Sequence, residues 1–399
     1  METLFKRHDQ YLMLTPMSIV RDVISDINWD SHLIAIVGAR GVGKSTLIRQ
    51  YIKKNYPAYD RSVLYCSLDA VYFTTHRISD LVQEFVMNGG KRLVLDEVHK
   101  YKDWSKEVKE IYDLYPELKV VISGSSLLEI LNADADLSRR CVRYMMHGLS
   151  FREFLAFYKG LDIPKYTLEE VIHNPGPLCS MVNAVCRPVQ CFKEYLLHGY
   201  YPFYMESEAD YYTKIEQIVN FVIEVELPQL RKVDVSNIRK LKALVSIISS
   251  EVPYELDASK ISRMVGIGRD TVVEYLVHLS DAGIFNLLYC DVRNIGKLSR
   301  PDKVYLENTN LLYALSYSDV NIGTLRETFA VSQLCIGHTV EYSKKHGDFC
   351  INGKQVFEVG GKDKNFTQIA GVQDSYVLAD DIETPLGRKL PLWVVGFLY

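Results

Sequence analysis

The stretch GARGVGKST, residues 38–46, follows the apolar run HLIAIV and leads into the segment KSTLIRQYIKK. It fits the pattern G-x-x-x-x-G-K-[ST], with Gly38, Gly43, Lys44 and Ser45 at the defining positions. A chance match in a chain of this length is on the order of one in a hundred. The run before the loop predicts a short buried strand, and the apolar spacing after it predicts a helix. Strand, glycine-rich loop and helix in this order predict an α/β P-loop NTPase core with a parallel sheet and helices on both faces.

The chemistry expected of this loop is the binding of a nucleotide triphosphate. Glycines let the backbone curl so that successive N–H groups point at phosphate oxygens, and the helix N-terminus adds partial positive charge. Lys44 is expected to reach the β- and γ-phosphates, and Ser45 to hold Mg²⁺. The guanine-reading pattern Asn-Lys-x-Asp does not occur, which favours ATP over GTP. The residues expected to contact the nucleotide are Gly38, Ala39, Arg40, Gly41, Val42, Gly43, Lys44, Ser45 and Thr46.

A second strand that ends in acids occurs at KRLVLDEVHK, residues 91–100. Asp96 ends the apolar run and is expected to join the Mg²⁺ shell. Glu97 follows it and is expected to polarise an attacking water. Alone, this pattern also fits an ordinary strand that ends in solvated acids. Together with the loop, the acidic pair predicts hydrolysis rather than mere switching or phosphoryl transfer to a substrate.

Polar residues follow the next predicted strand, LKVVISGSS, residues 118–126. Ser123 and Ser125 are candidates to sense the γ-phosphate, with Ser125 ahead of Ser126; a serine turn that caps the next helix is the alternative.

Arg139 and Arg140 precede a further strand, CVRYMMH. A guanidinium there could complete a γ-phosphate site in its own subunit or in a neighbour. A surface arginine pair is the alternative. The expected catalytic set is therefore Glu97, Lys44, Ser125 and Arg140.

The ordered set of motifs resembles the AAA-type ATPase family of bacteria and archaea that carries a C-terminal domain of unknown function. The matching pieces are GARGVGKST, LVLDEVHKYKDW, VVISGSS, LSRR before a strand, and LSFREFL. The family has Leu-x-Gly-Arg where this chain has LSRR at residues 137–140, so the family arginine falls on Arg140 and Arg139 replaces a glycine. The resemblance implies an ATPase that spans nearly the whole chain.

The composition is that of a globular protein with reduced thiols. With 46 basic and 50 acidic residues, the net charge of −4 does not favour nucleic acid or an anionic membrane as a partner. The sequence contains no run of 18 apolar residues, so we expect no membrane-spanning helix. The N-terminus METLFKRHDQ lacks the apolar core of a signal peptide. The eight cysteines form no Cys-x-x-Cys pair, so we expect a cytoplasmic protein.

Residues 235–295 predict a winged helix-turn-helix, after a helical lid or connector at residues 151–234. Three helical segments precede the strand-like run IFNLLYCDV, and Asp257 is a plausible N-cap of the second helix. The charges from residue 257 to 283 sum to −1, so this segment has little net positive charge with which to bind the phosphates of DNA. A protein–protein or intramolecular role is therefore favoured over DNA reading. The charges counted are Lys260, Arg263, Arg269, Asp257, Asp270, Glu274 and Asp281.

The tail, residues 296–399, resembles a PD-(D/E)XK nuclease core through Glu327 in a helix, Asp348 opening a strand and Glu358 in the next strand. Such enzymes hold Mg²⁺ between carboxylates and use a lysine two residues after the second one. Here that position is Gly360, and Lys362 could substitute only if the strand continues through two glycines. An inactive nuclease-like module for self-association or partner docking is therefore preferred to a nuclease.

The sequence thus predicts four parts: a P-loop ATPase core (1–150), the helical lid (151–234), the winged helix (235–295) and the nuclease-like α/β tail (296–399). The expected activity is Mg²⁺-dependent ATP hydrolysis coupled to rearrangement of the C-terminal domains. A protein partner or self-association is expected, and an ATP-gated nucleic-acid-binding protein or nuclease is the alternative. A scaffold that binds nucleotide without hydrolysing it is the third hypothesis.

Overall fold

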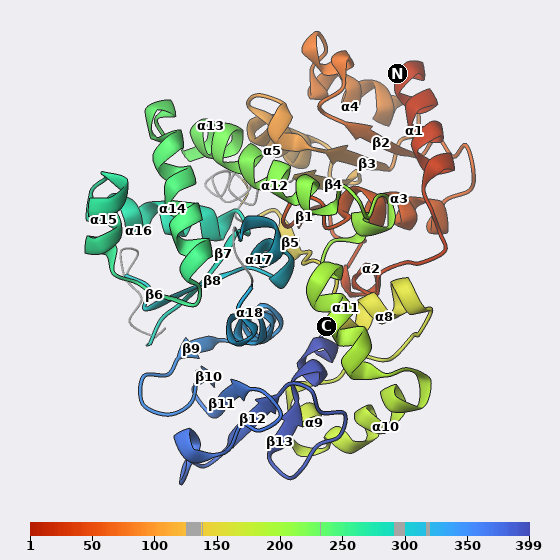
Figure 1. Ribbon diagram of the computed structural model, residues 1–399. Helices are drawn as coiled ribbons and strands as arrows, with labels where there is room; N and C mark the ends of the chain where they lie inside the picture. The colour runs from red at the N-terminus through yellow and green to blue at the C-terminus, as the bar shows by residue number, and fades with distance from the viewer. Residues whose placement is uncertain (125–136, 138, 232, 291–299, 317–319) are drawn as a thin grey trace. The chain divides into compact units, whose positions relative to one another are not determined.

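The chain forms two compact units, Met1–Gly148 and Leu149–Tyr399, in a computed structural model (Figure 1). The structure describes residues 1–124, 137, 139–231, 233–290, 300–316 and 320–399. The phosphate-loop motif lies in the first unit. The finer boundaries expected at residues 234 and 295 lie within the second unit and stay predictions.

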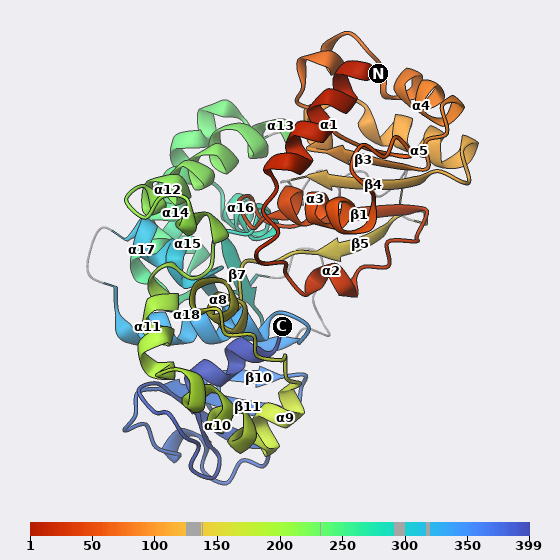
Figure 2. The same cartoon turned by 90° about the vertical axis from the view of Figure 1, so that its right-hand side faces the viewer.

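The first unit contains the predicted parallel sheet, so the expected α/β fold class is confirmed. Its five strands pair in the order β2-β3-β4-β1-β5, and every neighbouring pair is parallel. Figure 2 shows β3, β4, β1 and β5 in succession. The strands are β1 (Leu33–Val37), β2 (Val63–Ser67), β3 (Arg92–Asp96), β4 (Lys119–Gly124) and β5 (Val142–Met145).

Helices cover both faces of this sheet. The crossover from β1 to β2 runs in the opposite direction to the crossovers from β2 to β3 and from β3 to β4. Right-handed connections therefore place α3 on one face and α4 and α5 on the other. The apolar residues of β1, β3 and β4 that alternate toward α4 and α5 form the main core with them. The helices are α1 (Glu2–Leu14), α2 (Val23–Asp26), α3 (Lys44–Asn55), α4 (Ile78–Met87) and α5 (Trp104–Leu114), with short η1 (Val71–Thr74) and η2 (Val98–Lys100).

The second unit begins with helices where helices were predicted. Ser150 starts α8 by a capping box with Glu153, in the LSFREFL stretch. The helical run is interrupted once between α10 and α11: α10 ends at Val185 and α11 begins at Pro188, because the residue before a proline is disfavoured in helical conformation. The helices are α8 (Phe151–Lys159), α9 (Leu168–His173), α10 (Pro175–Val185), α11 (Pro188–His198), α12 (Tyr211–Phe221), a π-helical segment (Val222–Glu226) and α13 (Leu227–Arg231), with short η3 (Pro202–Met205).

Three helices and a small antiparallel sheet follow. Asp257 caps α15 as expected, because its side chain accepts hydrogen bonds from the backbone N–H groups of Ser259 and Lys260. The sheet has the order β6-β8-β7. The elements are η5 (Val235–Asn237), α14 (Ile238–Glu251), β6 (Tyr254–Glu255), α15 (Ala258–Val265), α16 (Arg269–Asp281), β7 (Phe285–Leu288) and β8 (Lys303–Leu306).

The tail contains a second five-stranded sheet of order β13-β12-β11-β10-β9. β11, β12 and β13 are parallel, and β9 and β10 add antiparallel pairs. The C-terminal segment η8 packs its aromatic rings on Phe151 of α8, so the two ends of this unit share a core. The elements are α17 (Thr309–Leu315), α18 (Ile322–Leu334), β9 (Val340–Tyr342), β10 (Phe349–Ile351), β11 (Gln355–Gly360), η7 (Thr367–Ile369), β12 (Ser375–Ala379), β13 (Lys389–Pro391) and η8 (Leu392–Phe397).

All eight cysteines are free thiols. Within the described part of the chain, no helix combines the length and the apolar character that crossing a membrane requires.

Candidate nucleotide site

The loop between β1 and α3 needs its glycines for two reasons. Gly41 and Gly43 have φ angles of 85° and 97°, in the left-handed region that other residues rarely adopt. Gly38 has φ 152°, and a Cβ atom there would lie 2.1 Å from the carbonyl oxygen of Met146. The backbone that follows β5 therefore presses directly on the start of the loop, and only glycine fits.

Lys44 is the first residue of α3, and its side chain is buried. Its Nζ donates hydrogen bonds of 2.8 Å to the carbonyl oxygens of Gly38 and Ala39. The ammonium is thus folded back over the loop that precedes it. The ammonium is thus placed where the phosphates of a bound nucleotide could replace the two carbonyl oxygens as its hydrogen-bond acceptors.

Asp96 is the last residue of β3 and is only 3% exposed. The hydroxyls of Tyr65 from β2 and Ser123 from β4 donate to its two carboxylate oxygens. Burial, followed by the charge of Asp96, raises the pKa of the Tyr65 hydroxyl, so this group stays a donor at neutral pH. Tyr65 was not predicted from the sequence, because nothing in its own strand marks it as a neighbour of Asp96.

Glu97 follows with a left-handed backbone, φ 56°, which is uncommon for a residue other than glycine. Burial and then the charge of Asp96 raise the pKa of its carboxyl, while Lys44 and Arg40 oppose that shift. Two residues of the loop and two of the acidic strand therefore act on one another electrostatically. The residues predicted from two motifs 53 positions apart meet at one edge of the sheet.

His99 is a further residue of this site that sequence reasoning missed. Its Nε2 lies 3.3 Å from Oε2 of Glu97, and its side chain is buried. Burial is the main cause that lowers the pKa of His99 to about 4, so the imidazole is neutral at pH 7. The contact therefore joins a neutral ring to the Glu97 carboxylate and is not an ion pair between two charged groups.

The polar residues at the end of β4 and just beyond it are only partly described. Ser123 is fully buried and bonded to Asp96. Ser125 and Ser126 lie outside the described residues, so the expectation that Ser125 senses the γ-phosphate stays a prediction.

Arg140 lies at the opposite edge of the sheet from the loop. It precedes β5, whose Val142 pairs with Ile34 of β1, whereas the loop follows Val37. The length of β1 alone separates the two edges by about 13 Å. The guanidinium instead makes two hydrogen bonds to Asp113, of 2.9 and 3.1 Å. In this structure Arg140 therefore does not reach the phosphate loop of its own chain.

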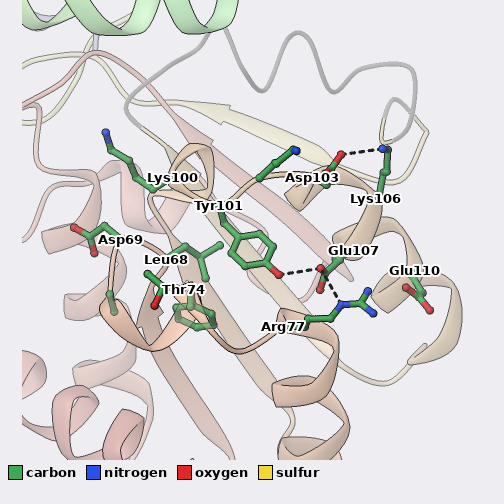
Figure 3. A pocket seen from close by; sticks show the side chains of 13 residues that line it. Leu68, Asp69, Thr74, Arg77, Lys100, Tyr101, Asp103, Lys106, Glu107 and Glu110 are labelled. Carbon is green, nitrogen blue, oxygen red and sulfur yellow. Dashed lines mark hydrogen bonds and ion pairs between the residues drawn. The ribbon is translucent and has the colours of Figure 1, made fainter.

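A hollow of about 800 Å³ lies beside the acidic strand but is not the nucleotide site (Figure 3). None of residues 38–46 lines it. Glu107 at its wall accepts hydrogen bonds from the Tyr101 hydroxyl and the Ser79 N–H, and it pairs with Arg77 at 3.5 Å. One part of its wall starts at Lys100, three residues beyond Glu97, so the segment that follows the acidic pair lines the hollow.

The three carboxylates of the tail come close together in the second unit. Burial and then the charge of Glu327 raise the pKa of Asp348 to about 7, and Glu358 adds to the shift. Glu327 accepts hydrogen bonds from Lys303 and Tyr305, at 3.0 and 2.7 Å. Among the described residues, no three carboxyl, imidazole or thiol groups are arranged to hold a metal ion. The second metal site therefore stays a prediction.

The condition set for Lys362, that the strand continue through both glycines, is not met. β11 ends at Gly360, so Lys362 lies in an exposed turn beyond the strand and cannot continue its face. Lys364 instead forms an ion pair with Glu358, whose side chain is 1% exposed. The glycine pair lets the chain turn back, which brings the Lys364 side chain over Gly360.

The substitution Asp348→Asn tests this cluster through the pH dependence of stability. A carboxyl with a raised pKa binds its proton more tightly in the folded state, so the wild type loses stability as pH rises from about 4 to 7. The Asp348→Asn variant should lose less stability than the wild type over the same pH range. At pH 8 its free energy of unfolding should exceed that of the wild type by about 1–3 kcal/mol. Urea denaturation followed by Trp393 fluorescence, with Trp29 and Trp104 replaced by Phe, measures this unit.

The exposed Asp363→Asn is the matched control and should follow the wild type. Parallel curves for Asp348→Asn and the wild type between pH 5 and pH 8 would contradict the interpretation.

Comparisons with known proteins identify an AAA domain that covers most of the first unit. Residues 30–155 match the family model of an AAA domain, and residues 189–324 match a model described as a domain of unknown function. An uncharacterized protein of Methanocaldococcus jannaschii is 24% identical over 371 residues, which cover 86% of this chain and 78% of that protein.

Three solved structures are also similar, each with a TM-score below 0.5, so we draw nothing from them. C. elegans PCH-2 is 12% identical with a TM-score of 0.24, over 40% of this chain and 46% of that chain. AMPPCP-bound DnaA from Aquifex aeolicus is 15% identical with a TM-score of 0.25, over 65% and 86%. Hsp104 with ATPγS and FITC casein is 19% identical with a TM-score of 0.33, over 70% and 53%. The chain thus spans about half the length of PCH-2 and of Hsp104.

The AAA part of the resemblance is thereby confirmed. The chain carries an AAA-type P-loop domain in residues 30–155, followed by a region that matches a domain of unknown function.

Proposed function

We propose that this protein is a Mg²⁺-dependent ATPase that couples its nucleotide state to rearrangement of residues 149–399 and acts on a protein partner. The observation that carries the proposal is the convergence of Lys44, Asp96 and Glu97. Lys44 starts α3 and the two acids lie at the end of β3, yet Asp96 and Lys44 both act on the Glu97 carboxyl: the charge of Asp96 raises its pKa and the charge of Lys44 opposes that shift. A charge set of this kind is what phosphoryl transfer to water requires.

The residues present fit ATP and Mg²⁺. We propose that the backbone N–H groups of the loop and the ammonium of Lys44, at the start of α3, bind the β- and γ-phosphates. Ser45 and Asp96 offer the oxygen ligands that Mg²⁺ prefers, and Tyr65 and Ser123 hold the Asp96 carboxylate in place. When bound, Mg²⁺ neutralises charge on the β- and γ-phosphate oxygens.

Glu97 is the group proposed to take a proton from the attacking water. The pKa of its carboxyl is raised, which makes it a stronger base than an exposed glutamate once it is ionised. His99 lies 3.3 Å from one of its oxygens, leaving the other oxygen available to orient water. His99 is thus a positioning residue for Glu97.

Arg140 is proposed to act on the nucleotide of a neighbouring subunit. Its place at the edge of the sheet opposite the loop supports action in trans rather than in cis. It would have to leave Asp113, to which it is bonded at 2.9 and 3.1 Å. An exposed ion pair of this kind contributes about 0.2–1 kcal/mol, so its exchange costs little.

The partner is proposed to be a protein, docked by the second unit. We interpret the helices α14, α15 and α16 and the sheet β6-β8-β7 as a winged helix that docks this partner. The charges over residues 257–283 sum to −1, which supports a protein or intramolecular contact over DNA. We also propose that the protein is cytoplasmic, because all eight cysteines are free.

The alternative is an ATP-gated nuclease that uses Glu327, Asp348 and Glu358. The closeness of these carboxylates and the Lys364–Glu358 ion pair favour it. It is disfavoured because each carboxylate already has a protein partner. Cleavage assays on DNA and RNA with Mg²⁺ or Mn²⁺, run beside Asp348→Ala, separate the two: metal-dependent cleavage lost in the variant would establish the nuclease.

Glu97→Gln tests hydrolysis most simply. The amide keeps the size of the side chain but cannot take a proton, so ATP turnover should fall about 100-fold or more while ATP binding persists. Phosphate release with Mg²⁺ measures turnover, and Glu110→Gln, an exposed acid on α5, is the matched control. Should the wild type release no more phosphate than Glu97→Gln, the protein is a nucleotide-stabilised scaffold instead.

Arg140→Ala tests the action in trans. Turnover should fall by about 100-fold or more, as when an arginine finger is lost, and the exposed neighbour Arg139→Ala should keep wild-type turnover. An equimolar mixture of Arg140→Ala with Glu97→Gln should recover part of the wild-type rate, because some interfaces then pair an intact Glu97 with an intact Arg140. A mixture that gives only the average of the two separate rates rules out this role.

A further inference from the structure

A second hollow lies at the edge of the first unit's sheet that is opposite the phosphate loop. Its volume is about 570 Å³, within the range of small-molecule sites. Arg92 and Lys119, the first residues of β3 and β4, are partners in the strand register and line it side by side. The site of ATP and this hollow therefore lie at the two ends of the same strands.

Arg92 is a buried cation without a close carboxylate. Its side chain is 3% exposed, and its Nε and Nη1 have no hydrogen-bond acceptor among the described residues. Its nearest acid is Asp30, with 4.0 Å between Nη2 and Oδ1, and the Asp30 side chain is 82% exposed. The rings of Tyr51 and Tyr56 lie 5.1 and 5.9 Å from the guanidinium carbon. Cation–π attraction offsets only part of the cost of burying this charge, since buried cations are normally paired.

The residues that line the hollow carry a net positive charge. Lys91, Arg92 and Lys119 line it against Asp30 and Glu117. The Lys119 ammonium is bonded to Asp30, so one exposed carboxylate serves both cations. Asp30 thus occupies the position in which an anion from solution would meet Arg92 and Lys119.

We propose that this hollow binds a small organic anion whose carboxylate or phosphate group replaces the Asp30 carboxylate between Arg92 and Lys119. The two basic side chains supply charge-assisted hydrogen bonds to the anionic group. Tyr51 and Tyr56 supply an aromatic wall for the rest of the molecule. The inference does not depend on ATP hydrolysis, because none of residues 38–46, 96 and 97 lines the hollow.

Calorimetric titration of the full chain with sodium citrate, and separately with inorganic phosphate, at constant ionic strength tests the proposal. The Lys44→Ala background removes phosphate binding at the loop. We expect one saturable site for at least one probe: citrate alone identifies a carboxylate site, phosphate alone a phosphate site, and both a general anion site. The absence of saturable binding with both probes overturns the proposal.

Variants assign that binding to the hollow. Asp30→Asn removes the competing carboxylate on an exposed side chain, so affinity should rise about two- to five-fold, as expected for an exposed pair. Lys119→Met should weaken binding, and Arg92→Met should abolish it with thermal unfolding still cooperative. Lys6→Gln, which removes an exposed cation on α1, should change nothing. Equal affinity in Asp30→Asn, Lys119→Met and the parent would place the anion elsewhere and overturn the proposal.

Discussion

The parallel register of β3, β4 and β1 is the constraint on which the nucleotide site depends. Ser123 of β4 pairs with Ile36 of β1 and donates to Asp96 at the end of β3. Because all three strands end at the same edge, the loop after β1 lies beside Asp96 without any adjustment of the loop itself. The backbone beyond β5 completes the site by pressing on Gly38. The register therefore brings a cation-bearing loop and two acids together from segments far apart in the sequence.

The loop, the acidic pair and their strands were predictable because their signals are local. A glycine pattern, a lysine and a β-branched run each constrain the backbone within a few residues. Tyr65 and the placement of Arg140 were not predictable, since each depends on how the strands are arranged in the sheet. The parallel pairing of β5 with β1 decides that Arg140 lies at the edge opposite the loop. A strand arrangement cannot be read from one sequence. His99 was missed for another reason: it lies only two residues beyond Glu97, but nothing in the local pattern marks its side chain as the one that contacts that carboxylate.

The second unit shows the same division between local and tertiary information. The cap at Asp257 and the order of Glu327, Asp348 and Glu358 were predicted from local pattern. The condition under which Lys362 could stand beside Glu358 is not met, because β11 ends at its glycines, and no local pattern indicated that Lys364 takes that place. Burial then draws the three carboxylates into one another's field, which raises the pKa of Asp348 to about 7. Burying several carboxylates together costs stability because the charges lose their hydration. The spatial cluster therefore says more about this part of the protein than the order of the three residues in the sequence.

Calorimetric titration of folded wild-type protein with Mg²⁺ and ATP, beside Lys44→Ala, measures whether the loop between β1 and α3 binds nucleotide. We expect one saturable site in the wild type that is lost in the variant, because the buried ammonium now held by Gly38 and Ala39 transfers to the phosphates. If the folded wild type takes up no adenine nucleotide, or if Lys44→Ala binds it equally well, the account of this site is wrong.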